Sequence, residues 1–477
     1  MWCGVRSVYS RLPLQSINMN QKPIIFLTVS RAIIVRNLLL NQGFFKKLSD
    51  KYEVVLLSPH ANDSEFQEIL KGFLTIPLLP RKLNRFTSWL EQKFISLHKA
   101  LIYNPSVKIA SEYGIMLRNP VKFKRLRNNL EKYFFSALGK MPFVRTFLKR
   151  LDKMIFPCSA YDEAIQKYKP ELIFITALGS DDEVALLRNS KKHGIKNVGM
   201  TVSWDNLSKN GMREKVDRLI VWSEYMKEEA TRFQGYSKDE VEVIGIPQFD
   251  HYVHLPLISK QEFCSQFGLD ANKKTILFGS SGPVGKDDTY MISFLRSEIL
   301  NGKLSDFQIL IRPHLAYKNE YDRFLESIDN RVVFMDMFKG NSHFKDRTAL
   351  NLEGEKNLKA QVHYSDVVIA GPSTFVLDVA VNGKTPLICD FDKDKNTPYG
   401  DSIHRLYNTL WFLEIRKFLN ASFVSDEVDL VEKIKRYGDD HDSDKLGRDA
   451  MIARLCHHFD GKSGERLFAV VDNHIQT

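Results

Sequence analysis

Short apolar runs alternate with longer stretches of helical periodicity along most of the chain. Between the runs, the spacing of apolar residues favours helices, for example Asp181–His193, which ends before Gly194. Strands separated by helices are typical of parallel sheets with crossover connections. In the first half, the apolar runs predict strands at Pro23–Val29, Glu53–Ser58, Phe73–Leu78, Leu172–Thr176, Asn197–Val202, Arg218–Trp222 and Val241–Ile244.

The second half repeats this alternation independently, which predicts an α/β protein with two tandem Rossmann-like domains. We expect an N-terminal domain over residues 19–255, a C-terminal domain over 256–415, and C-terminal helices over 416–477. Residues 1–18 form an expected extension, because Met19 stands just before the first strand and is the expected start. The predicted strands of the second half are Thr275–Gly279, Gln308–Arg312, Arg331–Met335, Asp366–Ala370 and Leu387–Asp390.

The composition narrows the class of protein. Of the 477 residues, 43% are hydrophobic and 26% are charged, as in an ordinary soluble protein. The five cysteines show no CxxC pair or zinc spacing, which favours reduced thiols in a cytosolic setting over a disulfide or metal scaffold. No apolar stretch reaches 18 residues, so we predict no transmembrane helix. We also predict no metal site and no resident cofactor.

The net charge of +10 is concentrated in residues 81–150, which hold 16 Lys and Arg against 3 Asp and Glu. This stretch belongs to a helical insertion predicted at about 81–165 in the first domain, and it mixes cations with aromatic residues. Such a mixture favours contact with an anionic membrane surface. The alternatives are a solvated insertion whose aromatics are core, and a nucleic-acid surface, which no accompanying motif supports.

Three loops of the second half follow predicted strands, where open α/β sheets bind ligands. After the first of these strands come Ser280, Ser281 and Gly282, small residues that let backbone N–H groups approach an anion. After the next come Arg312 and His314, which could both donate to a phosphate. A plain turn and a structural Arg/His pair are the alternative interpretations.

The third loop has the most specific pattern, a strand that runs into Gly371, Pro372, Ser373 and Thr374 before a helix at 375–382. Ser373 or Thr374 would cap this helix, whose free N–H groups favour an anion. Asp378 lies further along the helix and could bind hydroxyl groups of a sugar or ribose. It could equally be a polar helix residue.

The first half offers acidic candidates at two strand ends. Asp181 and Asp182 open a predicted helix, where one of them could be only a helix cap. Asp205 is a candidate general base or acceptor-binding group, although an Asx turn would explain it equally. We expect the following residues to line an acceptor site or cleft: Trp204, Asn206, Gln248 and Asp250.

These stretches together resemble GT-B-fold enzymes of surface-carbohydrate biosynthesis, near the CDP-glycerol glycerophosphotransferase-like and capsule-type glycosyltransferase families. The resemblance spans residues 20–415 and rests on 202–206, 221–223, 245–250, 312–314 and 371–374. It implies that the C-terminal domain holds a nucleotide diphosphate and the N-terminal domain an acceptor. It also implies that Arg312, His314, Ser373 and Thr374 meet the donor's phosphates, with Asp378 beside them.

The leading expectation is an inverting, metal-independent glycosyltransferase that works at the cytoplasmic face of the cell membrane as a peripheral protein. Inversion is expected because Asp378 stands alone where a retaining GT-B enzyme often has two acidic residues seven positions apart, and the membrane contact is expected from residues 81–150. Its donor would be a nucleotide-diphosphate sugar and its acceptor a glycan or lipid-linked molecule. Asp205, and after it Asp181 or Asp182, would deprotonate the acceptor, while His314 and Arg312 would stabilise the leaving diphosphate. The rival functions are a CDP-glycerol-type polyol-phosphate transferase, a non-hydrolysing nucleotide-sugar epimerase and a catalytically silent membrane-associated scaffold.

Overall fold

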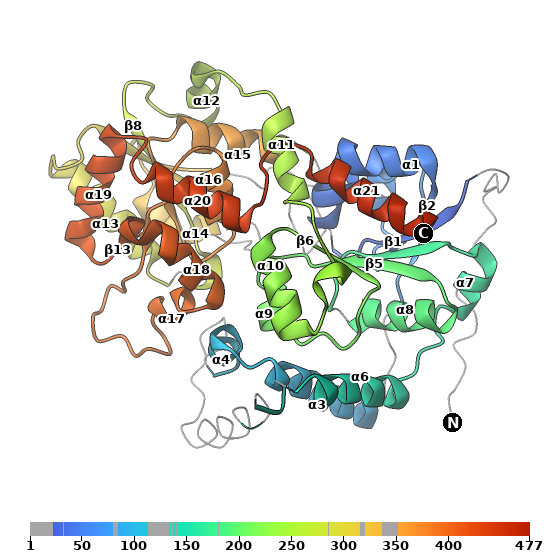
Figure 1. Cartoon of the computed structure of the whole chain (residues 1–477). Coiled ribbons are helices and arrows are strands. Elements are labelled where there is room, and N and C mark those ends of the chain that lie inside the picture. The colour runs from blue at the N-terminus through green and yellow to red at the C-terminus, as the bar shows by residue number, and fades with distance from the viewer. Residues whose placement is uncertain are drawn as a thin grey trace. The chain divides into compact units, whose positions relative to one another are not determined.

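Two compact units make up the chain in the computed structural model (Figure 1). Unit 1 comprises Met1–Tyr103, Arg127–Pro247 and Lys462–Thr477, and unit 2 comprises Asn104–Leu126 and Gln248–Gly461. The expected extension at 1–18 lies outside the described residues. The structure describes residues 22–31, 33–79, 84–112, 134, 137–139, 141–179, 181–284, 286–314, 320–335 and 352–477.

Within the described part of unit 1, seven parallel strands form one sheet in the order β3-β2-β1-β4-β5-β6-β7. The order reverses between β1 and β4, as in a doubly wound Rossmann-like sheet. The strands are short, and the inner residues of the five strands between β3 and β7 are buried, because helices cover both faces; the edge strands β3 and β7 are partly exposed. The strands are β1 (Ile24–Thr28), β2 (Glu53–Ser58), β3 (Leu74–Pro77), β4 (Leu172–Ile175), β5 (Lys196–Met200), β6 (Arg218–Val221) and β7 (Val241–Val243).

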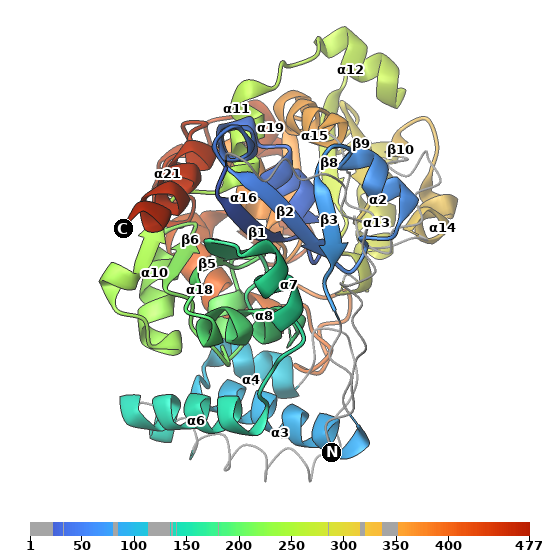
Figure 2. The same cartoon turned by 90° about the vertical axis from the view of Figure 1, so that its right-hand side faces the viewer.

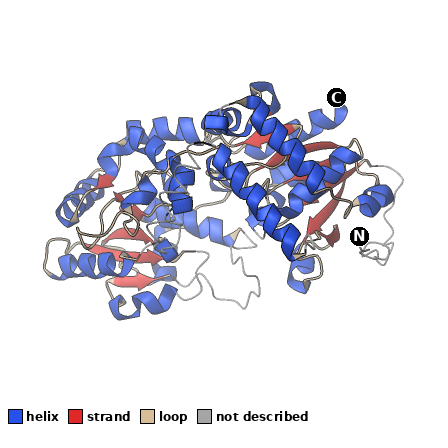
Figure 3. Cartoon of the chain, turned by 90° about the horizontal axis from the view of Figure 1, so that it is seen from below, coloured by secondary structure: helices blue, strands red, loops and turns tan. Residues whose placement is uncertain are grey.

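The helices of unit 1 connect these strands and flank their sheet (Figure 3). The helical insertion contributes α3, α6 and α7 to this unit. The helices are η2 (Val35–Leu39), η3 (Gln42–Lys46), α1 (Lys47–Lys51), α2 (Ser64–Ile69), α3 (Arg85–Leu101), α6 (Pro142–Ile155), α7 (Asp162–Tyr168), α8 (Asp181–Lys192), α9 (Asn206–Lys209), α10 (Glu224–Glu229), η4 (Ala230–Gln234), η5 (Lys238–Glu240) and α21 (Ser463–Gln476).

The last helix, α21, packs on unit 1 although it follows unit 2 in the sequence (Figures 1 and 2). The Tyr52 hydroxyl donates to Asp472 at 2.6 Å, and the Lys196 ammonium donates to the carbonyl of Ile475 at 2.9 Å. The chain therefore returns to its first domain at its end.

Unit 2 repeats the Rossmann-like order. Within its described residues, four parallel strands form a sheet in the order β10-β9-β8-β11. A bridge between Ile369 and Leu387 continues this sheet towards the pair β12 and β13. The sequence patterns predict all of these strands except β13. The strands are β8 (Lys274–Gly279), β9 (Phe307–Arg312), β10 (Val332–Phe334), β11 (Val367–Ala370), β12 (Ile388–Cys389) and β13 (Phe423–Val424).

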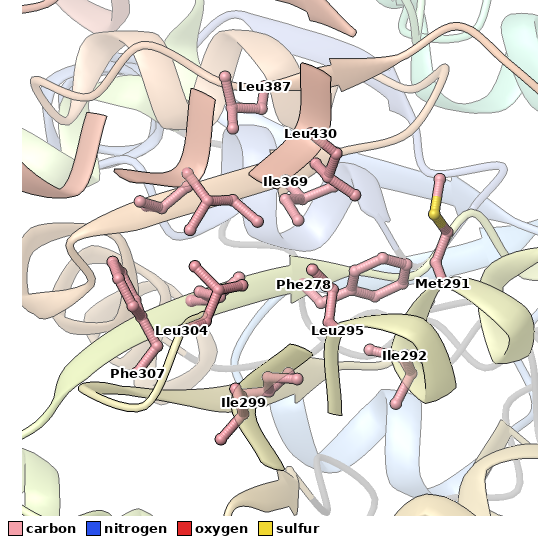
Figure 4. Packing of buried hydrophobic residues seen from close by; sticks show 14 of the residues in the cluster. Phe278, Met291, Ile292, Leu295, Ile299, Leu304, Phe307, Ile369, Leu387 and Leu430 are labelled. Carbon is pink, nitrogen blue, oxygen red and sulfur yellow. The ribbon is translucent and has the colours of Figure 1, made fainter. Parts of the chain in front are cut away.

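The core of unit 2 lies where α13 and α19 pack on this sheet (Figure 4). Phe278 and Ile369 come from the two central strands, and Leu295 and Leu430 come from the helices. The helices of this unit are α4 (Pro105–Glu112), α11 (Asp250–His254), α12 (Lys260–Phe267), η7 (Gly282–Val284), α13 (Asp288–Leu300), α14 (Glu320–Phe324), η8 (Leu325–Ser327), α15 (Glu353–Tyr364), α16 (Phe375–Val381), α17 (His404–Tyr407), α18 (Leu410–Leu419), η9 (Asn420–Ser422), α19 (Glu427–Asp439) and α20 (Lys445–Leu455).

The chain is thus α/β, with two tandem Rossmann-like domains and a helical C-terminal end, as the sequence predicts. The turn η6 (Pro247–Phe249) contains the boundary between the two units. Within the described ranges, no helix has both the length and the apolar character that a bilayer-spanning helix needs.

A buried ionic cluster joins the insertion to the Rossmann-like core of unit 1. The fully buried Asp152 of α6 accepts hydrogen bonds from Arg213 at 2.8 and 2.9 Å, from Arg188 at 2.8 Å and from His98 at 2.9 Å. Arg213 also donates to the buried Glu91 of α3 at 2.6 Å. Burial acts to raise the pKa of Asp152, but the hydrogen bonds from Arg213 and His98 outweigh it and hold the pKa well below its usual range.

We expect Asp152→Asn to lower the free energy of unfolding by about 3–5 kcal/mol, because two buried arginines would lose their common counter-charge. Denaturant unfolding of the full chain measures this change. The control is Lys47→Ala, which breaks an exposed pair with Glu465 and should cost about 0–1 kcal/mol. Equal losses in the two variants would contradict an anchoring role for Asp152.

Candidate functional site

The three loops that the sequence singles out in the second half lie together at one edge of the sheet of unit 2. Gly279, at the end of β8, pairs with Ala370 of β11 on one side and with Arg312 of β9 on the other. The strand order reverses between β8 and β11, and ligands of open α/β sheets bind at such switch points.

The loop after β8 is tied to the start of α13 by the buried carboxylate of Asp288. One oxygen of Asp288 accepts from the Ser280 hydroxyl at 2.9 Å and from the Ser281 N–H at 2.8 Å. The Gly282 N–H donates to the Ser280 oxygen at 3.1 Å, and Gly282 has a φ of +59°, which favours glycine. The Ser280 hydroxyl and the N–H groups of Ser281 and Gly282, which the sequence suggests as phosphate donors, therefore make hydrogen bonds that hold the loop in place.

The segments that follow β8 and β11 approach each other closely at two glycines. A Cβ atom on Gly371 would lie 1.9 Å from the Ser281 hydroxyl oxygen. A Cβ atom on Gly279 would lie 2.5 Å from the ring of Phe375, the first residue of α16. Both glycines are required because a side chain at either position would separate the two loops.

Arg312 and His314 extend this arrangement from β9. The buried Arg312 guanidinium lies over the Phe375 ring, 5.3 Å from its centre, and the Arg312 carbonyl accepts from the Ser280 N–H at 3.0 Å. The His314 ring packs on Gly282, where a Cβ atom would lie 2.7 Å from the imidazole. A cation and an imidazole thus stand beside both small-residue loops.

The start of α16 differs from the predicted cap. Thr374 occupies the N-cap position, but its side chain makes no capping bond, because its backbone is helical rather than extended. Instead, the Ser373 hydroxyl accepts from the Phe375 N–H at 3.3 Å, and the Ser373 N–H donates to the Gly371 carbonyl at 2.8 Å. Residues from Gly371 through Pro372 to Phe375 remain partly exposed and can meet a ligand.

Asp378 is held by another helix. Its carboxylate accepts from the Tyr252 hydroxyl of α11 at 2.6 Å, so the interpretation as a polar helix residue already accounts for this side chain. The Asp378 carboxylate is engaged within the protein. Gln248 and Asp250, two of the residues expected to line an acceptor site or cleft, belong to the same unit as Asp378. Gln248 is partly exposed, whereas Asp250 is buried at the start of α11.

A small cavity of about 40 Å³ lies beneath the β8 and β11 loops, lined in part by Ser281, Asp288 and Gly371. Its volume suits ordered water rather than a nucleotide. Burial raises the pKa of the Cys389 thiol, which also lines it, to about 12. Burial therefore disfavours the thiolate form of this cysteine.

In unit 1, Asp205 follows β5 with its side chain 30% exposed. Its carboxylate pairs with Lys209 one helical turn later, at 3.3 Å. The turn here is closed by Asn206, whose side-chain oxygen accepts from the Ser203 N–H at 3.0 Å, so Asp205 is not the residue that closes it. Trp204 is buried.

The other acidic candidates of unit 1 lie at the first turn of α8, after β4. Asp182 is partly exposed, and Asp181 begins the helix, while its side chain lies outside the described residues. The next residue, Glu183, is buried and accepts from the Ala177 N–H at 2.9 Å. It holds the loop after β4 as Asp288 holds the loop after β8.

Sequence reasoning missed Asp288, Phe375, Tyr252 and Glu183. A signal was available for Asp288 and Glu183, because acidic residues in the first turn of a helix after a strand favour contacts with free N–H groups. Among the described residues, no group of three or more His, Cys, Asp or Glu side chains is arranged to hold a metal ion.

A family model described as CDP-glycerol:poly(glycerophosphate) glycerophosphotransferase matches residues 191–473, more than half of the chain. The chain belongs to this family. A second model, monogalactosyldiacylglycerol (MGDG) synthase, matches residues 89–247. A comparison with curated proteins gave no match.

Solved structures with a similar fold include a protein from Listeria monocytogenes described as a UDP-N-acetylglucosamine 2-epimerase, with a TM-score of 0.53 and 11% identity. That alignment covers 96% of this chain and 97% of that one. A glycosyltransferase from Rickettsia africae has a TM-score of 0.51 and 13% identity, with 96% and 99% covered. The UDP-GlcNAc 2-epimerase of Methanocaldococcus jannaschii has a TM-score of 0.51 and 10% identity, with 95% and 100% covered. The family and the fold together identify a transferase-like protein of the GT-B type.

We expect Gly371→Ala to lower the free energy of unfolding by about 1–3 kcal/mol, because the new methyl group would overlap Ser281. Thermal unfolding of the full chain measures this cost. In Ser281→Gly/Gly371→Ala the obstructing hydroxyl is gone, so much of the loss should be recovered. Additive losses in the double variant would show that the two loops do not meet at these residues.

Proposed function

We propose that this protein is a transferase whose unit 2 binds a nucleoside-diphosphate-activated donor and whose product is a substituted acceptor hydroxyl. The observation that carries the proposal is the convergence of the loops after β8, β9 and β11 around Gly279, at the switch point of the sheet.

In this proposal the donor's phosphates lie against the exposed edge formed by 371–375 and beside Arg312 and His314. A guanidinium that rests on the Phe375 ring keeps its orientation and can donate two parallel hydrogen bonds to a phosphate. Positive charge fixed there would stabilise the leaving group as its negative charge develops. Ser373 and Thr374 would add hydroxyl donors from a partly exposed position.

The proposed base is Asp205 of unit 1, with Asp182 and Asp181 as the next candidates. Its carboxylate is partly exposed, which leaves the group accessible to an acceptor hydroxyl. A single displacement at the sugar carbon would invert its configuration. In this proposal, sugar transfer inverts the configuration of that carbon and needs no metal ion.

Two groups are candidates for transfer. In sugar transfer, the acceptor oxygen bonds to the anomeric carbon, the bond from that carbon to the phosphate oxygen breaks, and a nucleoside diphosphate leaves. In polyol-phosphate transfer, the acceptor oxygen bonds to the outer phosphorus, the phosphoanhydride bond breaks, and CMP leaves. The family match favours polyol phosphate, whereas a sugar is the leading expectation from the sequence, whose donor loops suit either group. In either case the base takes the acceptor proton.

The proposed acceptor is a glycan or a lipid-linked molecule in surface-polysaccharide synthesis at the cytoplasmic face of the membrane. The exposed aromatic residues of α3 and α6, together with their cations, support peripheral contact with an anionic surface. Phe86, Trp89, Phe143 and Phe147 are all more than half exposed.

We expect one nucleotide or donor from a panel of UDP, GDP, CDP, ADP and their sugar or polyol conjugates to stabilise the protein. Binding at a hundredfold excess over the dissociation constant adds about 2.7 kcal/mol to the stability of the folded state, which thermal unfolding detects. Arg312→Lys should weaken this binding about tenfold, because an ammonium cannot make the bidentate contact.

The matched control is Arg296→Lys, an arginine of α13 that pairs with Asp329 in the same unit and should leave binding unchanged. Release of CMP with an acceptor present would identify polyol-phosphate transfer, and release of a nucleoside diphosphate would identify sugar transfer. Conversion of the donor without acceptor would indicate an epimerase. If no compound of the panel binds, the transferase proposal fails and a scaffold role gains support.

We expect Asp205→Asn to lower kcat by about 10²–10⁴-fold and to leave donor affinity unchanged, because only proton removal from the acceptor is lost. Steady-state kinetics and donor titration measure the two quantities. Asp239→Asn, at an exposed acid of the same unit, is the control. An unchanged kcat in the Asp205 variant would remove this residue from the mechanism.

A further inference from the structure

A large basic cavity lies in unit 1, outside the loops discussed so far. Its volume is about 640 Å³, and its lining contains seven Lys and Arg side chains but a single carboxylate, Glu214. Four of the cations come from α6: Arg145, Lys149, Arg150 and Lys153. The cavity is large enough for a phosphate-bearing group, and its lining is strongly cationic.

The carboxylates that pair with the cations of this cavity, Glu214 and Glu240, are fewer than those cations. Glu214 pairs with Lys191 at 2.9 Å, and Lys215 pairs with Glu240 at 2.8 Å. Within the part of unit 1 that the structure describes, no carboxylate lies within ion-pair distance of the four cations of α6. An excess of positive charge therefore faces the cavity.

Two of these cations are fixed by backbone contacts. Arg145 donates to the carbonyls of Arg232 and Phe233 at 3.0 Å each, at the end of η4, and Lys149 donates to the Gln234 carbonyl at 3.1 Å. Because these side chains are already oriented, an incoming anion would not have to order them.

The environment of Lys149 disfavours its own charge. The pKa of Lys149 is lowered to about 7, chiefly by burial and next by the positive charge of Lys215, against the opposite effect of Glu214. Lys191 and Arg145 act in the same direction as Lys215. A bound anion would relieve this repulsion and favour the charged ammonium.

The cavity lies at the edge of the sheet opposite to the candidate base. Besides the residues of α6, its lining comes from segments at the amino ends of parallel strands: Lys191 precedes β5, Lys215 precedes β6 and Gly235 precedes β7. Asp205 follows the carboxyl end of β5. A ligand in the cavity would therefore be separate from the reacting acceptor hydroxyl.

An exposed apolar stripe borders the cavity on the same helix. Phe143, Phe147 and Met154 of α6 are 69%, 64% and 73% exposed, and their spacing places them on one face. Arg150 lies between the last two of them in sequence and also lines the cavity. A ligand with a phosphate and an apolar body would find both surfaces side by side.

We propose that this cavity is a second ligand site, which binds the phosphate group of an anionic ligand. The phosphate would come from an acidic phospholipid headgroup or from a soluble phosphate ester. The lipid case rests on the proposed membrane contact, whereas the soluble case does not, and neither depends on the donor site of unit 2.

The test compares three forms of the full chain with the unmodified protein. Arg150→Gln/Lys153→Gln removes two exposed cations of the cavity, and Lys46→Gln/Lys71→Gln removes two exposed cations elsewhere in unit 1. Phe143→Ser/Phe147→Ser interrupts the apolar stripe. Each form is sedimented with vesicles of phosphatidylcholine, with and without an acidic phospholipid, and is titrated with inorganic pyrophosphate.

For a lipid headgroup, we expect the cavity variant to lose about tenfold or more in affinity for acidic vesicles, the phenylalanine variant to lose affinity as well, and pyrophosphate to bind weakly. For a soluble phosphate, pyrophosphate should bind and lose about tenfold in the cavity variant alone. Binding to neutral vesicles reports general membrane contact separately. Equal behaviour of the cavity variant and the Lys46/Lys71 control in both assays would overturn the proposal.

Discussion

The arrangement of unit 2 depends on the contact between the loops that follow β8 and β11. Parallel neighbours in a sheet are only about 5 Å apart, so two loops that leave it side by side compete for the same space. Because Gly371 has no side chain, the Ser281 hydroxyl fits beside it, and the Phe375 ring fits beside Gly279 for the same reason. Asp288 then fixes the first loop from below through two hydrogen bonds. Arg312 and His314 are positioned against this pair of loops, through Phe375 and Gly282.

In both units, a carboxylate in the first turn of a helix accepts a hydrogen bond from an N–H group of the preceding loop. A loop between a parallel strand and its helix exposes N–H groups that water would otherwise have to satisfy. In unit 1 the carboxylate of Glu183 accepts from the Ala177 N–H, and in unit 2 Asp288 accepts from Ser281. Each acid lies in the first turn of the following helix, where the helix dipole favours a negative charge. The N–H groups of Ala177 and Ser281 are therefore already satisfied within the protein.

Much of the fold could be predicted because β1 to β12 are apolar runs separated by helices with their own period. The pair β12–β13 was harder, since Phe423–Val424 is too short to give a pattern of its own. The three loops of unit 2 could be selected by their position after strands. The role of each residue in these loops could not be predicted. Ser280 is held by Asp288, 8 residues away, and Asp378 by Tyr252, 126 residues away. Such partners are set by packing, which a single sequence does not reveal.

The same reasoning separates two kinds of charge in unit 1. At Asp152, positive and negative groups are buried together and satisfy one another, so this cluster can hold the insertion but has no charge left for a ligand. On the same helix, Lys149 and Arg150 line a large cavity, whose carboxylate Glu214 is already paired with Lys191. One helix thus contributes both to a charge-balanced cluster that anchors it and to the cationic lining of a cavity. The first explains why the insertion is stable, and the second is where an anion gains most from binding.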